Sequence, residues 1–367
     1  MTDTENQISA PLSPEMRGRY EEDLERTKVH HEKMRQELAN GLLEGRSILC
    51  VEQFGTKPGW PHYLKALEPE RRKLLDEGLA GGPHTIHSEI VAHQFGFTRD
   101  EIGYNPDDNR PFVVWRASHG EEPPGRPLTD YAAVLMTGSD RMVTEVWNTA
   151  DGDEAPWMKN VITLSRNLAK HNIPGLYVCF GHQIYAACWS ENETMGPDAE
   201  AGRVEGAVDW IRNKEGIKER EFGPVTLYLT EEARQDPILQ GLGANYFTIA
   251  ASHSQHVPES RRPVQARVLA YNQEDSPTPG NPNAQSQMFA YEDGMRWTIQ
   301  NHPELTGAVL DIVSDIRAEA IIAEKGDEGF RKIKQDIIDF DTSRPREVVM
   351  SNFLQIAGKM LRAEPIK

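Results

Sequence analysis

The chain has 367 residues, of which 38% are hydrophobic and 26% charged, and its formal net charge is -17. This composition predicts a soluble globular protein of one large domain or two small ones. The acidic excess disfavours nucleic acid and anionic membrane surfaces as partners. The three cysteines are too few and too irregularly spaced for a disulfide framework, and no long apolar run is present. We therefore expect a cytoplasmic protein.

The first part of the chain is predicted to be a disordered start followed by a charged helix. Residues 1–13 are polar, and apolar residues then recur at helical spacings from Pro14 to about Leu43. Two adjacent histidines, His30 and His31, lie within this helix. We expect them on a solvated helix face rather than in a metal site.

The remaining elements predict an α/β fold with an open, mostly parallel sheet, helices on both faces and a small antiparallel extension. A strand, a helix and a second strand between residues 130 and 178 imply a right-handed parallel crossover. The predicted strands are 46–52, 111–116, 130–139, 173–178, 222–229, 247–251, 264–272, 286–291 and 296–304. The predicted helical segments are 63–79, 157–171, 183–187, a short piece at 208–211, and then 305–325, 329–340 and 346–363.

Cys179 follows a short apolar strand and precedes a helical pattern. A sharp turn between a strand and a helix exposes a nucleophile at the carboxyl edge of a parallel sheet, and it strains the backbone there. The first N–H groups of the helix favour a thiolate and an oxyanion. We expect Gly181 to be needed where helix and strand approach closely. A buried cysteine acting as a small hydrophobic residue fits the local pattern equally well.

Two other segments supply partners for this cysteine. Gly138 and Ser139 end the neighbouring strand, where a glycine permits close approach of the backbone to a ligand. His302 and Glu304 are separated by one proline in an extended segment, so their side chains lie on the same side. A carboxylate held beside an imidazole fixes its tautomer and orientation. The set predicts a nucleophile, a base and an orienting acid.

The segments Cys179-Phe180-Gly181-His182-Gln183 and His302-Pro303-Glu304 together resemble the class I glutamine amidotransferase domain. The resemblance covers roughly residues 46–320 and is closest to the stand-alone, GMP-synthase-like amidotransferases and the plant γ-glutamyl peptidases. It implies a flavodoxin-like sheet. Residues 1–45 would then be a disordered start with a helical extension, and residues 321–367 a C-terminal helical extension.

The resemblance also implies residue roles. Cys179 would attack the γ-carbonyl carbon of glutamine or of a γ-glutamyl amide, His302 would transfer the proton, and Glu304 would orient His302. The backbone N–H of Phe180 and one at Gly138 or Ser139 would hold the oxyanion, and Gln183 would help to bind the glutamyl group. The resemblance implies no cofactor and no metal ion.

Three positions depart from the family pattern, and several functions stay open. Tyr177 stands where the family has glycine, Cys188-Trp189-Ser190 replaces a glycine pair, and Gln255 replaces an acidic residue. We expect Tyr177 to shape the substrate pocket. Because no P-loop pattern occurs, a glutaminase that donates ammonia would need a separate synthetase or ammonia-accepting subunit. The alternatives are a γ-glutamyl peptidase without ammonia transfer and a non-catalytic binding or regulatory module.

Overall fold

The computed structural model describes residues 12–53, 69–75, 87–139, 143, 155–189, 208–212, 216–272, 285–291, 294–340 and 343–362. Two predictions lie mostly outside these residues, the disordered start at 1–13 and the helix at 63–79.

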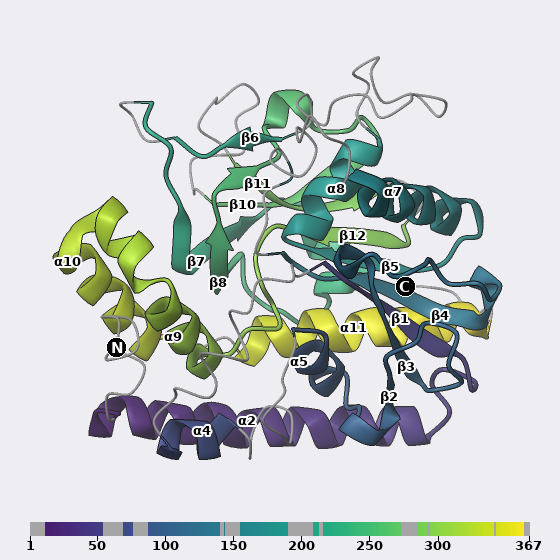
Figure 1. Ribbon diagram of the computed structural model, residues 1–367, viewed down its shortest axis with the longest axis horizontal. Coiled ribbons are helices and arrows are strands. Elements are labelled where there is room, and N and C mark those ends of the chain that lie inside the picture. The colour runs from purple at the N-terminus through teal and green to yellow at the C-terminus, as the bar shows by residue number, and fades with distance from the viewer. Residues whose placement is uncertain are drawn as a thin grey trace.

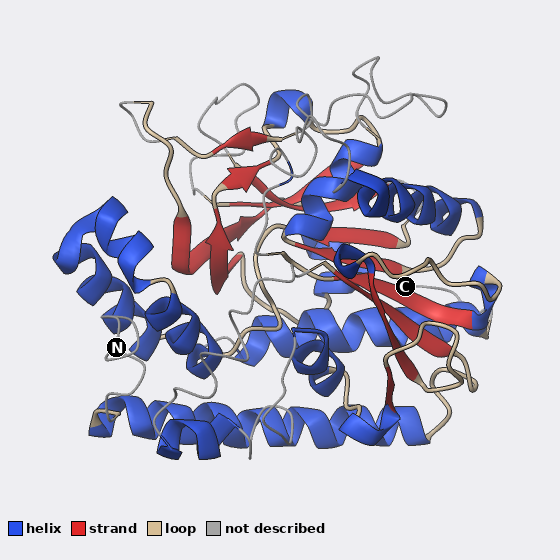
Figure 2. Ribbon diagram, in the orientation of Figure 1, coloured by secondary structure: helices blue, strands red, loops and turns tan. Residues whose placement is uncertain are grey.

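Ten strands of the described residues form one open sheet at the centre of the molecule (Figure 1; Figure 2). Neighbours from β2 to β12 are parallel, and neighbours from β12 to β8 are antiparallel. The predicted α/β sheet with an antiparallel extension is therefore confirmed. The strand order is β2 (Ile102–Gly103), β3 (Phe112–Arg116), β1 (Ser47–Glu52), β4 (Tyr131–Met136), β5 (Gly175–Val178), β12 (Arg296–Ile299), β11 (Ser286–Tyr291), β10 (Ala266–Tyr271), β7 (Glu221–Leu229) and β8 (Tyr246–His253).

The prediction of a helical piece at 208–211 is wrong. The structure has a short strand there, β6 (Asp209–Trp210), which pairs in antiparallel fashion with β9 (Gln255–His256). Val208 and Ile211 are both buried, and their spacing of three suggested one face of a helix. The Ile211 N–H instead donates to the Ser254 carbonyl at 2.9 Å, so pairing with a distant segment overrides the local pattern.

Helices cover both faces of the sheet (Figure 1). On one face α7 (Ala155–Lys170) packs against α8 (Phe180–Cys188), and α8 lies on β5 and β12. On the other face, α5 (His87–Gln94) contacts β1, and α11 (Ser343–Leu361) contacts β4 and β8. Short 3-10 helices occupy Arg99–Glu101, Ala117–His119, Leu128–Asp130, Glu232–Gln235, Pro237–Leu239 and Glu259–Arg261.

A further layer of helices lies outside the second face. The long helix α2 (Pro14–Ala39) contacts α5, α9 and α11, and α4 (Pro69–Leu75) lies against it (Figure 1). Helices α9 (Gly307–Ile316) and α10 (Ala318–Ile338) pack on each other, and α10 also contacts β7. The predicted helical C-terminal segment is thus present, with a kink at Gly326, where φ is 72°.

The two adjacent histidines of α2 are buried, so the prediction of a solvated face for them is wrong. His30 Nε2 donates to the Gln94 carbonyl at 2.9 Å, and His31 Nδ1 donates to the His93 carbonyl at 3.0 Å. Both carbonyls belong to the last turn of α5, where the helix itself supplies no donors. Burial lowers the pKa of His30 to about 4, so its imidazole is neutral and donates as an N–H group.

None of the helices in the described part of the chain combines the length and the apolar character needed to cross a bilayer.

Helix α11 is expected to stabilise the core, because Leu354 is fully buried among residues of the sheet and α5. Leu354→Ala should lower the free energy of unfolding by about 2–5 kcal/mol through lost burial and a residual cavity. Urea denaturation measures this loss. Gln355→Ala, on the half-exposed side of the same turn, should change stability by less than about 0.5 kcal/mol. Equal effects of the two substitutions would contradict the core role of α11.

Candidate active site

Cys179 sits on a strained turn between β5 and α8. Its φ and ψ are 51° and -103°, a region that residues other than glycine rarely adopt and that costs about 1–3 kcal/mol. Its N–H donates to the Ile299 carbonyl at 2.7 Å. At Gly181, a Cβ atom would lie 3.0 Å from the backbone oxygen of Met136 on β4. The predicted strain and the predicted need for glycine at 181 are both confirmed.

His302 reaches the same edge of the sheet by way of β12. Strands β5 and β12 are parallel, with Val178 opposite Ile299, so both chains leave the sheet on the same side. The His302 N–H donates to the Ala250 carbonyl of β8 at 2.8 Å. His302 Nδ1 donates to Glu304 Oε1 at 2.8 Å, and both side chains are buried. The pairing expected from their spacing in the sequence is therefore present.

The site favours a charged imidazole beside a charged carboxylate. Burial alone would lower the pKa of His302, but the negative charges of Glu304 and Cys179, and hydrogen bonds with both, raise it to about 10. Burial alone would raise the pKa of Glu304, but attraction and hydrogen bonds from His302 and His87 hold it well below its usual range. At neutral pH the pair is therefore an imidazolium and a carboxylate.

Gly138 lies against both Cys179 and His302. A Cβ atom at this position would lie 2.9 Å from His302 Cε1 and 3.4 Å from Cys179 Cβ. A glycine at this position therefore leaves room for His302 and Cys179, and the close approach of its backbone to a ligand stays a prediction. The neighbouring Ser139 turns its side chain away toward β1, where its Oγ donates to the Gln53 carbonyl at 2.7 Å.

The structure links Gln183 to Cys179 through Gln300, a residue that was not predicted from the sequence. Gln183 Nε2 donates to the Gln255 carbonyl at 2.8 Å and to Gln300 Oε1 at 3.1 Å. Gln300 Nε2 in turn donates to Cys179 Sγ at 3.7 Å. The spacing of two between Gln300 and His302 in an extended segment could have revealed this residue.

Phe180 begins α8 directly after the nucleophile. The N–H groups of the first helical turn have no carbonyl partner within the helix. Its ring is buried and stacks on Trp157 of α7, with ring centroids 6.0 Å apart. The backbone of Phe180 is thus anchored next to Cys179.

Tyr177 does not occupy a pocket, contrary to the prediction. Its side chain is fully buried, and its ring centroid lies 4.1 Å from that of Tyr185 in α8. Space for the ring comes from Gly175, where a Cβ atom would lie 2.6 Å from Tyr177 Cε2. The tyrosine therefore fills the core beneath α8.

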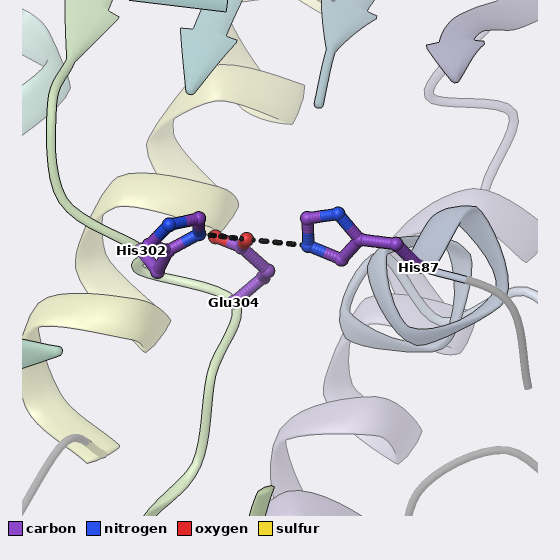
Figure 3. Close-up of side chains that lie close together, drawn as sticks. All are labelled: His87, His302 and Glu304. Atoms are coloured by element: carbon purple, nitrogen blue, oxygen red, sulfur yellow. Dashed lines mark hydrogen bonds and ion pairs between the residues drawn. The ribbon is translucent and has the colours of Figure 1, made fainter. Parts of the chain in front are cut away.

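A second histidine, His87 at the start of α5, also contacts the acid (Figure 3). His87 Nε2 donates to Glu304 Oε1 at 2.7 Å, and the rings of His87 and His302 lie 6.1 Å apart. No local pattern connects His87 with Glu304, which lies 217 positions further along the chain.

The three groups His87, His302 and Glu304 form a donor set of the kind that binds metal ions. A tetrahedral zinc ion would hold its ligand atoms roughly 3.3 Å apart. The two nitrogens lie 2.7 and 2.8 Å from the carboxylate oxygen. These distances fit two N–H donors on one oxygen better than they fit zinc.

Comparisons with known proteins support the fold. No family model matches the sequence, and no curated protein matches it significantly. Among solved structures, the chain is similar to a glutamine amidotransferase from Thermotoga maritima, with a TM-score of 0.50, 14% identity, and coverage of 86% of this chain and 98% of that one. It is also similar to one from Methylobacillus flagellatus, with a TM-score of 0.49, 16% identity, and coverage of 85% and 95%. The first likeness shows that the fold is shared with a glutamine amidotransferase.

The close approach at Gly138 generates a test of the site. Gly138→Ala should displace His302, because the added Cβ would lie 2.9 Å from its Cε1 atom. We expect the rate of Cys179 alkylation by iodoacetamide at neutral pH to fall by about tenfold or more. Gly18→Ala, in α2 with nothing within 4 Å of the added atom, is the matched control and should react like the unmodified protein. An unchanged rate in Gly138→Ala would contradict the described geometry.

Proposed function

We propose that the chain is a cysteine hydrolase of the glutamine amidotransferase type, which cleaves a γ-glutamyl amide through a thioester at Cys179. The observation that carries this proposal is the convergence of three features at one edge of the sheet. These are the strained turn at Cys179, the adjacent imidazole of His302 and the buried Glu304 behind it. The shared fold is consistent with the same chemistry but does not establish it.

In the first half of the reaction, the sulfur of Cys179 attacks the γ-carbonyl carbon, and the carbonyl oxygen becomes an oxyanion. The C–N bond then breaks as the imidazolium of His302 gives its proton to the leaving amine. In the second half, water gives a proton to His302 and attacks the thioester carbon. The C–S bond breaks, the sulfur of Cys179 leaves as a thiolate, and the γ-carboxylic acid that is released gives its remaining proton to solvent.

Backbone N–H groups would stabilise the oxyanion in both halves. The N–H of Phe180 lies at the start of α8, and Gly138 and Ser139 lie beside the nucleophile on the adjacent strand end. Each well-placed donor contributes about 3 kcal/mol of transition-state stabilisation. We assign Gln183 a supporting role, because its amide already donates to Gln255 and Gln300.

The leaving amine decides between the narrower functions. A glutaminase would release ammonia and pass it to a separate synthetase or ammonia-accepting subunit. A γ-glutamyl peptidase would release an amino acid or peptide to water. Glutamate release from a panel of glutamine, glutathione and γ-glutamyl amides separates these two, and absence of release from every member would favour a non-catalytic module.

A γ-glutamyl electrophile tests the nucleophile directly. Diazo-oxo-norleucine should modify Cys179 stoichiometrically, because the thiol lies at the N-terminus of α8 beside His302. Intact-protein and peptide mass spectrometry measure the label. The modification should vanish in Cys179→Ala and fall strongly in His302→Ala, whereas Cys188→Ala, which changes a buried cysteine of α8, should label fully. Failure to label Cys179 would rule out the enzyme proposal.

The charge state of His302 predicts the alkaline limb of the pH profile. The pKa of His302 is raised from 6.5 to about 10, so the imidazolium persists at neutral pH and is lost as pH rises through about 10. Hydrolysis should decline over the same interval, and the stability that the ion pair contributes, which is fully present below about pH 6.5, should be lost there too.

The matched variant for this prediction is Glu304→Gln. Removing the carboxylate charge removes the main force that raises the pKa of His302, so the alkaline limb of hydrolysis should move to lower pH. Initial rates across the pH range, with circular dichroism to confirm folding, measure the shift. An alkaline limb that stays in place in Glu304→Gln would show that another group sets it.

A further inference from the structure

We propose that His87 is a positioning residue, whose imidazole holds the Glu304 carboxylate in the orientation that serves His302. The inference rests on the proposed function, because it assigns His87 a role in the same site. His87 acts through Glu304 and does not itself touch a reacting atom.

The hydrogen bonds to the Glu304 carboxylate support this role. His87 Nε2 and His302 Nδ1 both donate to Oε1, at 2.7 and 2.8 Å, from opposite sides of the carboxylate (Figure 3). The other oxygen, Oε2, is buried and has no hydrogen-bond partner among the described residues. The carboxylate is 1% exposed. Among the described residues, its orientation therefore depends on two donors at a single oxygen, and without His87 only the bond from His302 would remain there.

His87 is itself held at a fixed place because α5 is anchored at both of its ends. At the first turn, the Ser88 N–H donates to Oε2 of Glu52, at the end of β1, at 3.0 Å. At the last turn, His30 and His31 of α2 donate to carbonyls of α5. The long helix α2 thus holds α5 in place, and α5 carries His87 at its first position.

The other titratable groups near the acid cannot replace His87 as donors to it. Glu52 and Cys50 of β1 lie on this side of the sheet, and burial together with the charges of Glu52 and Glu304 raises the pKa of Cys50 well above its usual value. Glu52 Oε2 accepts a hydrogen bond from the Ser88 N–H of α5, so this side chain acts as an acceptor and not as a donor. Cys179 faces His302 rather than the carboxylate. His87 is therefore the hydrogen-bond donor to the Glu304 carboxylate on the side opposite His302.

Loss of His87 should weaken the support that Glu304 gives to the imidazolium. The carboxylate would be free to rotate, and the imidazolium would be less favoured over the neutral ring. Because the imidazolium in turn favours the thiolate of Cys179, the reactivity of the thiolate at mildly acidic pH should fall. Hydrolysis should also slow, by about tenfold to a hundredfold in kcat with little change in KM, since a misplaced group costs rate rather than binding.

The experiment compares alkylation of Cys179 by iodoacetamide at about pH 6 and about pH 10, which reports thiolate formation without any substrate. The variants are His87→Leu, which removes the donor, and His87→Gln, whose amide N–H replaces Nε2 without titrating. His171→Leu is the control for loss of an imidazole elsewhere in the chain, because His171 is exposed just after the end of α7. Burial raises the pKa of Cys188 to about 12 and that of Cys50 well above its usual value. Alkylation of these two cysteines is the background of the assay, and Cys179→Ala measures this background at both pH values.

The inference predicts that His87→Leu lowers the ratio of the acidic to the alkaline rate by about threefold or more, a shift of about half a pH unit. His87→Gln should restore most of the ratio, and His171→Leu should leave it unchanged. A purely structural role would lower both rates together and leave the ratio intact. An unchanged or increased ratio in His87→Leu would overturn the inference.

The same experiment separates this inference from the proposed function. His302→Gln should lower the ratio strongly. If it does and His87→Leu does not, only the role of His87 fails. If neither variant changes the ratio, His302 does not activate Cys179 and both proposals fail. If both variants lower the ratio but no γ-glutamyl compound is hydrolysed, the role of His87 stands and the proposed substrate is wrong.

Discussion

Among the described residues, the hydrogen bond from the Cys179 N–H to the Ile299 carbonyl is the last backbone bond that joins the chain of β5 to that of β12, and the site depends on it. Beyond this bond the two chains diverge, one into α8 and the other toward His302. A slip of this register by one residue would turn His302 to the opposite side. The strain at Cys179 persists because the sheet on one side and the buried helix on the other leave the backbone no relaxed alternative.

A single buried negative charge organises the polar part of the site. Glu304 is almost fully buried, where an uncompensated carboxylate would be strongly destabilising. Two imidazoles, one from the segment that follows β12 and one from α5, supply that compensation. These two hydrogen bonds therefore join α5 to the segment after β12 through the Glu304 carboxylate. The same negative charge raises the pKa of His302, so the ion pair both stabilises the fold and keeps this histidine protonated.

The sequence predicted those parts of the site that depend on local patterns. The strand before Cys179, the turn and the spacing of His302 and Glu304 can be recognised because strand alternation and turn geometry act over a few residues. The contacts of His87 and of the α2 histidines join segments far apart in the chain, and no periodicity encodes them. The strand at β6 escaped prediction for the same reason, since its partner β9 lies far along the chain.

Gly175 and Tyr177 divide a fixed volume beneath α8 between them. The space that a glycine at 177 would leave open is filled by the tyrosine ring, and a side chain at 175 would collide with that ring. Neither position can therefore change alone without leaving a void or creating a clash. Substitutions at the two positions are therefore coupled, and a change of Tyr177 to glycine requires either a less stable intermediate or a simultaneous change at both positions.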